Sequence, residues 1–151
     1  MNALQQAMLL GPKEPAHWMD TFNAHVDLTA LGAVKGRITA LADDHVVLEM
    51  EISDASRQPF GLLHGGVSLL LAETAASMHS AWLADITKVA PVGVDINGTH
   101  ISGASEGLVR ATGRVIRAGR SMIFHEVEIL HVPTERLLSV CRVTNFLKPH
   151  G

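Results

Sequence analysis

The tripeptide His64-Gly65-Gly66 precedes a long apolar segment, and its backbone could bind a developing negative charge. At the start of a helix the first N–H groups have no intrahelical partner, and the helix dipole is positive there. A carbonyl oxygen that gains negative charge could be held at this point, because glycine has no side chain to keep it away. The alternative is an ordinary helix N-terminus without a chemical role.

Glu73 is the single acidic residue between positions 65 and 84. A carboxylate that loses its water is costly, so a buried one needs hydrogen bonds, a raised pKa or a water-filled cavity. Ser77 and Ser80 lie one and two turns further on, where their hydroxyls could bond the carboxylate or a water beside it. The alternative is an exposed helix face or a structural capping role for Glu73, with serines that simply permit close helix packing.

The spacing between Gly65 and Glu73 limits how they could act together. If this segment is helical, eight residues separate the two groups by about 12 Å along the axis. One reacting carbon cannot meet both within a single chain. A two-fold pair of helices would bring Glu73 of one chain to Gly65 of the other, so we expect a homodimer with shared active sites.

The spacing of apolar residues predicts the elements that position these groups. The period is helical in the first thirty residues and alternates in two segments before residue 53. Four later segments, rich in Val, Ile, Thr or Phe, are divided by turn-forming residues. The expected elements are a loose lead-in at 1–13 with one weak helical turn, a helix at 15–30, hairpin strands at 34–40 and 46–52, a loop at 53–63, a helix at 65–84, and strands at 90–101, 107–118, 121–132 and 137–147.

This order of elements predicts an α+β fold. The four later strands follow one another too closely for helical crossovers, so we expect an antiparallel meander. A helix that is apolar nearly all round has to be enclosed on several sides, which a curled sheet would achieve. The chain of 151 residues has the size of one domain. We expect an N-terminal lead-in and helix at 1–32, followed by a single domain at 33–148.

Two stretches of the sequence carry a family resemblance. They read Arg57-Gln58-Pro59-Phe60-Gly61-Leu62-Leu63-His64-Gly65-Gly66-Val67 and Leu71-Ala72-Glu73-Thr74. They resemble the hotdog-fold thioesterases of the phenylacetic-acid-degradation type, and most closely the branch that hydrolyses 4-hydroxybenzoyl-CoA and 1,4-dihydroxy-2-naphthoyl-CoA. The resemblance covers residues 30 to 147. It implies a hotdog fold, in which a curved antiparallel sheet wraps a long central helix, here with an N-terminal helical extension.

The resemblance also implies roles for five residues in hydrolysis of an acyl-CoA thioester. Glu73 would act as nucleophile or as general base on water. Gly65 would donate its backbone N–H to the thioester oxygen, while Gln58 and His64 would position the thioester or water. Ser77 matches a position where the family often has a hydroxyl.

Substrate-binding residues follow from the same resemblance. Asn97 and His100 match the strand that lines the acyl pocket, and the turn Gly119-Arg120-Ser121 matches the place where the CoA phosphates or pantetheine arm are held. Ser102 supplies no charge where relatives often carry a basic residue, so Arg117 and Arg120 are the expected phosphate contacts. Thr99 stands where close relatives often have Asn.

The sequence does not identify the acyl group of the substrate. An expected pocket lining suits an aromatic acyl group and a medium-length chain equally well; it comprises Phe60, Leu63, Val67, Met78 and Trp82. A non-catalytic acyl-CoA-binding protein on the same fold is the alternative function, and the presence of Glu73 argues against it. A hotdog hydratase would need an Asp and His pair in a different loop pattern.

Composition excludes several other classes of function. A net charge of −3 and no clustered Lys or Arg give no basis for nucleic-acid binding. Nine histidines show no recognised ligand spacing, so we expect no metal, and no cofactor beyond the CoA of the substrate. A single Cys141, no secretory signal and no membrane segment favour a cytoplasmic protein. The resemblance further implies that the expected homodimer assembles into a homotetramer.

Overall fold

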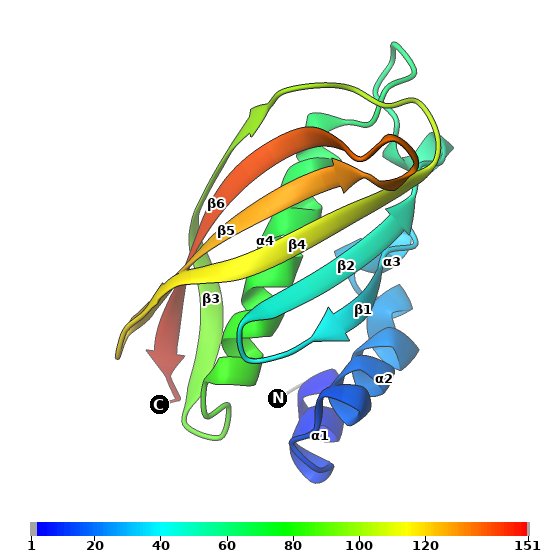
Figure 1. Ribbon diagram of the computed structural model, residues 1–151. Coiled ribbons are helices and arrows are strands. Elements are labelled where there is room, and N and C mark those ends of the chain that lie inside the picture. Colours follow the sequence, from blue (N-terminus) through cyan, green and yellow to red (C-terminus); the bar gives the residue numbers. More distant parts are fainter. Residues whose placement is uncertain (1–2, 151) are drawn as a thin grey trace.

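Six strands form one antiparallel sheet in the computed structural model, which describes residues 3–150 (Figure 1). The strands are β1 (Arg37–Leu41), β2 (His45–Glu51), β3 (Val89–His100), β4 (Leu108–Ala118), β5 (Met122–His131) and β6 (Arg136–Pro149). Their order across the sheet is β1-β2-β4-β5-β6-β3. The hotdog fold implied by the sequence is confirmed.

The expected meander of four strands is only partly correct. Strands β4, β5 and β6 are consecutive neighbours, but β3 pairs with β6 and lies at one edge of the sheet. Alternation of apolar residues reveals a strand without revealing its neighbour, because pairing depends on residues far apart in the sequence. Within the described part of the chain, β3 therefore has one partner strand and one free edge.

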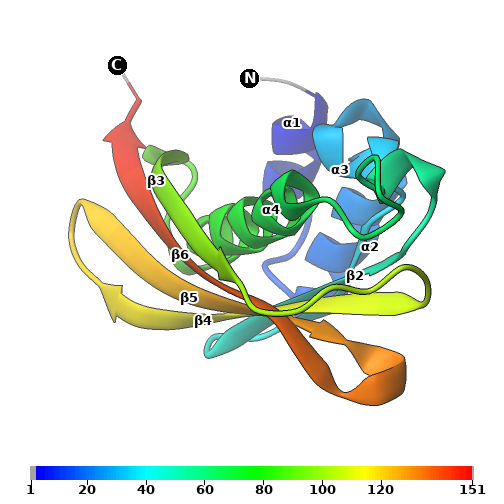
Figure 2. The same cartoon turned by 90° about the horizontal axis from the view of Figure 1, so that it is seen from above.

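The long helix α4 (Gly65–Leu83) lies in the concave face of the sheet, close to the predicted bounds (Figure 2). Ala72, Ala75 and Ala76 are fully buried, and their small side chains let the helix approach the strands closely. The sheet contributes inward-facing apolar residues such as Val109 and Val127 to the same core. Alternating burial along β4 and β5 matches a sheet with one covered face.

Three short helical elements replace the single helix expected at 15–30. They are α2 (Pro15–His25), the 3-10 turn η1 (Val26–Leu28) and α3 (Ala30–Ala33). The backbone of Thr29 is extended, which interrupts the helix. Because Val34 and Lys35 form the turn that ends α3, β1 starts at Arg37 and not at residue 34.

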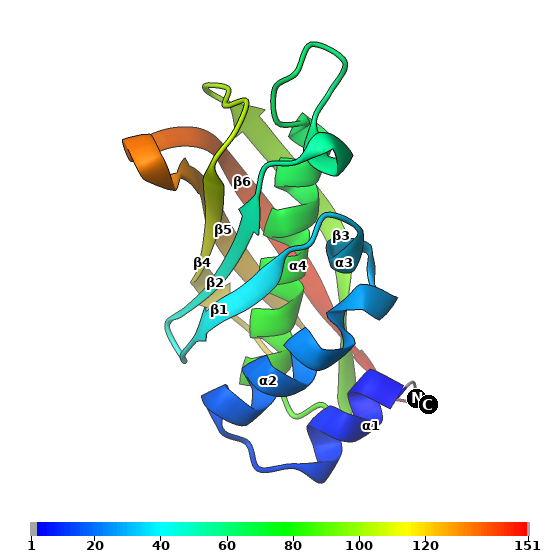
Figure 3. The same cartoon turned by 90° about the vertical axis from the view of Figure 1, so that its right-hand side faces the viewer.

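The lead-in also differs from expectation, since it forms the eight-residue helix α1 (Ala3–Leu10). So short a helix is marginal alone, and packing of an apolar face stabilises it. Met8 provides that contact and is buried in the common core. Trp18 of α2 meets Trp82 of α4 edge to face, with ring centroids 5.4 Å apart. Figure 3 shows α1 at the end of the molecule where α4 finishes and β3 begins.

Candidate active site

The N-terminus of α4 is capped by His64. The Gly66 backbone N–H donates to His64 Nδ1 at 2.8 Å, while the backbone of His64 itself is extended. The cap satisfies one of the first N–H groups of the helix, as side-chain caps usually do. His64 thus has a structural task that the sequence did not predict, and its expected role in positioning a thioester stays a prediction.

A pocket of about 320 Å³ opens beside Gly65. Gln58, Gly65 and His100, which the sequence assigned to the site from three separate segments, all line this pocket. A Cβ on Gly65 would lie 2.5 Å from His100 Nε2, so glycine is needed for the imidazole to approach the helix terminus. His100 Nδ1 is hydrogen-bonded to Ser139 Oγ at 2.8 Å, which orients the ring. Ser102, the departure from the family pattern, lies in the same lining.

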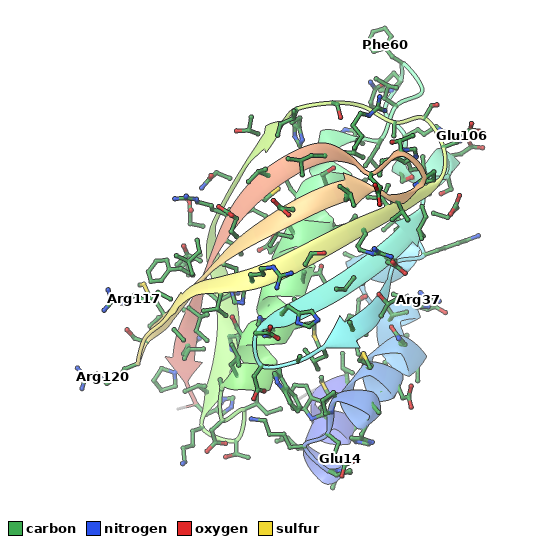
Figure 4. All side chains as sticks on the ribbon, viewed as in Figure 1. Glu14, Arg37, Phe60, Glu106, Arg117 and Arg120 are labelled. Carbon is green, nitrogen blue, oxygen red and sulfur yellow. The ribbon has the colours of Figure 1, made fainter. Side chains whose placement is uncertain are left out.

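The loop before α4 positions Gln58 and presents Phe60 to solvent. The Phe60 backbone N–H donates to Gln58 Oε1, and Gly61 at the turn has a positive φ of 86°. Phe60 is 91% exposed at the loop tip (Figure 4) and lines neither of the two pockets described here. Its expected contact with substrate therefore remains a prediction that this single chain does not support.

Glu73 is exposed in the middle of α4. The sheet wraps the buried side of this helix, which includes Leu71, Ala72, Ala75 and Ala76, and Glu73 lies on the side that the sheet leaves open. The carboxylate lies against the edge strand: a Cβ on Gly93 would be 2.5 Å from Glu73 Oε1. The pocket beside Gly65 does not include Glu73. The two groups are thus held apart on one helix, as their spacing predicted.

Asn145 is a buried neighbour of the site that sequence reasoning missed. Its Nδ2 donates to Ser77 Oγ at 2.9 Å, and the Ser80 hydroxyl donates to its Oδ1 at 3.2 Å. As an acceptor in this bond, Ser77 can still donate its own proton to a group one turn away, where Glu73 lies. The sequence does carry one sign of this role, because Asn145 is a polar amide within an otherwise largely apolar strand.

A second and larger pocket, of about 820 Å³, begins at Ser77. Its walls come from α1, from α4 beginning at Ser77, from the loop between α4 and β3, from the first residues of β3 and from the end of the chain after β6. They are Leu4, Met8, Leu9, Ser77, Met78, Ala81, Ile86, Thr87, Val89, Ala90, Pro91 and His150. Of the expected acyl-pocket residues, Met78 lies here and Leu63 lies in the pocket beside Gly65. Trp82 is buried, and its Nε1 donates to Asp43 Oδ1 at 2.8 Å.

The remaining predicted substrate contacts are exposed. Asn97 on β3 donates from Nδ2 to Asp95 Oδ2 at 3.3 Å. The hairpin between β4 and β5 is closed by the Gly119 backbone N–H, which donates to Met122 O at 2.8 Å. Arg117 and Arg120 lie on this hairpin, at the end of the sheet opposite the Phe60 loop (Figure 4). Ser121 belongs to the same hairpin.

Among residues 3–150, no three His, Cys, Asp or Glu side chains are grouped as metal ligands would be. Within the same residues, no helix combines the length and the apolar character needed to cross a bilayer.

Comparison with known proteins identifies the family. Residues 60–137 match the family described as "Thioesterase superfamily". A 1,4-dihydroxy-2-naphthoyl-CoA hydrolase of Listeria monocytogenes is 37% identical over 111 residues, which cover 74% of this chain and 89% of that protein. The solved structure of a mutant thioesterase from Pseudomonas aeruginosa has a TM-score of 0.84 and 28% identity, covering 87% of this chain and 94% of the other. A thioesterase of Haemophilus influenzae gives a TM-score of 0.82 at 30% identity, with 87% and 90% covered.

The matched segment contains the N-terminus of α4, most residues that line the pocket beside it, and the exposed Glu73 on the same helix. The curved six-stranded sheet, the central helix and these similarities agree. The chain belongs to the thioesterase superfamily, has the hotdog fold and is a thioester hydrolase.

Proposed function

We propose that this protein hydrolyses acyl-CoA thioesters in active sites shared by two chains. Gly65 of one chain would polarise the thioester carbonyl, and Glu73 of the other would deliver or activate the attack. The observation that carries the proposal is the placement of both groups along a single free edge: Glu73 lies against Gly93 of β3, and Gly65 lies against His100 of the same strand.

Antiparallel pairing of two copies of β3 would join the separated groups. Strand β3 has a bulge between Gly93 and Asp95, so Gly93 and His100 lie on the same face of the sheet although seven residues separate them. If Gly93 stands opposite His100 of the partner subunit, the two-fold axis passes near Asn97, in the middle of the strand. Residues directly opposite in an antiparallel pair point to the same face. Both Gly93 and His100 face α4, so this register is consistent with the pleat. It brings Glu73 next to the partner's Gly65.

The free edge of β3 supports such a dimer. An edge strand carries unpaired N–H and C=O groups, which favours pairing with another strand. Val92 and Val94 on this strand are 41% and 54% exposed, and a partner would cover apolar surface of this kind. The expected homotetramer stays a prediction.

The proposed reaction consumes one water for each thioester. The Gly65 N–H, at the positive end of α4, stabilises the negative charge that forms on the carbonyl oxygen when the carbonyl carbon is attacked. As general base, Glu73 accepts a proton from the attacking water. As nucleophile, it forms an anhydride that water then cleaves. On either route the C–S bond breaks, the CoA sulfur takes up a proton, and the free acid leaves.

The surroundings of Glu73 support an apolar acyl group. The pocket of about 820 Å³ begins at Ser77, one turn beyond Glu73, and its walls are mostly apolar. The relative named as a 1,4-dihydroxy-2-naphthoyl-CoA hydrolase adds aryl-CoA thioesters to the substrates worth testing.

Hydrolysis by wild type and by Glu73→Gln, measured on a panel of alkanoyl-CoA and aryl-CoA thioesters, tests the proposal. The amide keeps the shape of the side chain but neither accepts the proton nor attacks as an anion. We expect turnover to fall by about a thousandfold or more while thioester binding persists. Saturable binding by wild type without turnover above that of the variant would instead support the non-catalytic acyl-CoA-binding alternative.

A further inference from the structure

We propose that α1 is the end wall of the acyl pocket and limits the length of an unbranched, medium-length acyl chain. The inference rests on the proposed function, since it takes Glu73 as the point where the thioester is cleaved. It assigns to the N-terminal helix a role in substrate selection.

The large pocket begins one helical turn beyond Glu73 and follows α4 toward its C-terminal end. Its lining on α4 begins at Ser77 and continues through Met78 to Ala81, away from the pocket beside Gly65. On β3 it uses the residues up to Pro91, two positions before the glycine that touches Glu73. From Glu73 to Ala81 the helix rises about 12 Å. An acyl chain attached at the reacting carbon can therefore extend along α4 into this space.

Helix α1 provides one wall of the large pocket. Leu4, Met8 and Leu9 line the pocket from the side of α1, and the adjacent Leu10 is 88% exposed and lies outside the lining. Figure 3 shows α1 beside the end of α4, where the pocket is expected to finish. The helix thus presents one apolar face to the pocket and leaves Leu10 in solvent.

Polar groups at the far end favour an alkyl chain over a hydroxylated ring. The Thr87 hydroxyl donates to Asp85 Oδ1 at 2.6 Å, and His150 Nε2 is hydrogen-bonded to Ile86 O at 3.0 Å. Apart from these groups and Ser77 the lining side chains are apolar, so most hydroxyl groups of an aryl substrate buried there would lack partners, which is costly. A saturated chain needs no polar partner. Met8 and Met78 are flexible side chains that can adapt to such a chain.

Substitutions at Leu9 test the wall in both directions, with Leu10 as the matched control. Steady-state kcat/KM is measured for butanoyl-, octanoyl-, dodecanoyl- and hexadecanoyl-CoA and for an aryl-CoA. Leu9→Trp fills the pocket, so we expect kcat/KM to fall about tenfold for dodecanoyl-CoA and to stay within about twofold for butanoyl-CoA. Leu9→Ala moves the preferred chain length upward. Leu10→Trp, on the exposed side of α1, changes neither kcat/KM for these substrates nor the preferred chain length.

The outcomes separate this inference from the proposed function. A wild-type protein without activity on any CoA thioester defeats the proposed function itself. If the wild type is active and both Leu9 variants keep its chain-length profile, the role of α1 is overturned while the proposed function stands. A wild-type preference for aryl-CoA over every alkanoyl-CoA has the same consequence. Opposite shifts from one position cannot arise from loss of folding, which a melting curve of each variant checks independently.

Discussion

The Glu73 carboxylate lies directly against the backbone of Gly93, at a point where a Cβ would be only 2.5 Å from Oε1. Helix α4 and the edge strand β3 meet here. Because Gly93 has no side chain, the carboxylate can lie at the free edge of the sheet. The proposed mechanism depends on this placement.

Gly93→Ala is expected to reduce turnover without unfolding the protein. The added methyl group meets the end of a flexible side chain, so Glu73 can turn away at little cost to stability. A displacement of about 1 Å at a reacting group can lower kcat by about a hundredfold. Steady-state kinetics together with a thermal melt would show this, and unchanged kcat would mean that the carboxylate does not react from this position.

Two inactive variants are expected to restore activity when mixed. In a shared site, a heterodimer of Glu73→Ala and Gly65→Val has one site with both changes and one intact site. Equal mixing with free exchange of subunits then gives about a quarter of the wild-type activity. The mixture is unfolded partially, refolded and assayed beside each variant treated alone. Sites built within one chain would leave the mixture as inactive as its parts.

Arg120→Ala is expected to weaken binding of the CoA nucleotide. Arg120 lies exposed on the hairpin between β4 and β5, where it can meet phosphates with its guanidinium. We expect KM for an acyl-CoA to rise about threefold to tenfold with kcat unchanged, and less so at high salt. The same acyl group on N-acetylcysteamine has no nucleotide and should show no change. Arg142→Ala, which removes an exposed cation from β6, is the matched control.

A buried pair of histidines is expected to make the fold sensitive to acid. His79 and His125 are fully buried, with His79 Nδ1 3.0 Å from His125 Nε2. His79 Nε2 donates to the carbonyl of Ala42, so His79 Nδ1 accepts from His125. Burial, together with a smaller effect of the nearby His79, lowers the pKa of His125 from 6.5 to about 4. Burial also lowers the pKa of His79, although the Ala42 carbonyl opposes that shift.

Unfolding exposes both rings, which then bind protons below about pH 6.5. The free energy of unfolding should therefore decrease as the pH falls from about 6.5 toward 4, by roughly 3 kcal/mol from His125 alone. Urea unfolding at a series of pH values measures this slope. His125→Phe should flatten it. Equal slopes for wild type and His125→Phe would contradict the prediction.

Much of the site could be predicted because helices are local structures. The apolar run, the glycines at its start and the single internal acid define α4, and the constant helical rise then separates Gly65 from Glu73. The strands followed in the same way from residue type and turn signals. The resemblance identified the family and the fold, and both are confirmed.

The neighbours of those elements were decided by tertiary structure. No periodicity shows that β3 pairs with β6 and keeps a free edge, or that Gly93 meets Glu73 while His100 meets Gly65. These contacts join residues far apart in the sequence, and packing in three dimensions selects them. Helix α1 also depends on tertiary structure, because so short a helix is stabilised by the apolar surface that it covers. The sequence by itself therefore identified the candidate groups of the site, whereas the tertiary structure decided along which strand edge these groups lie.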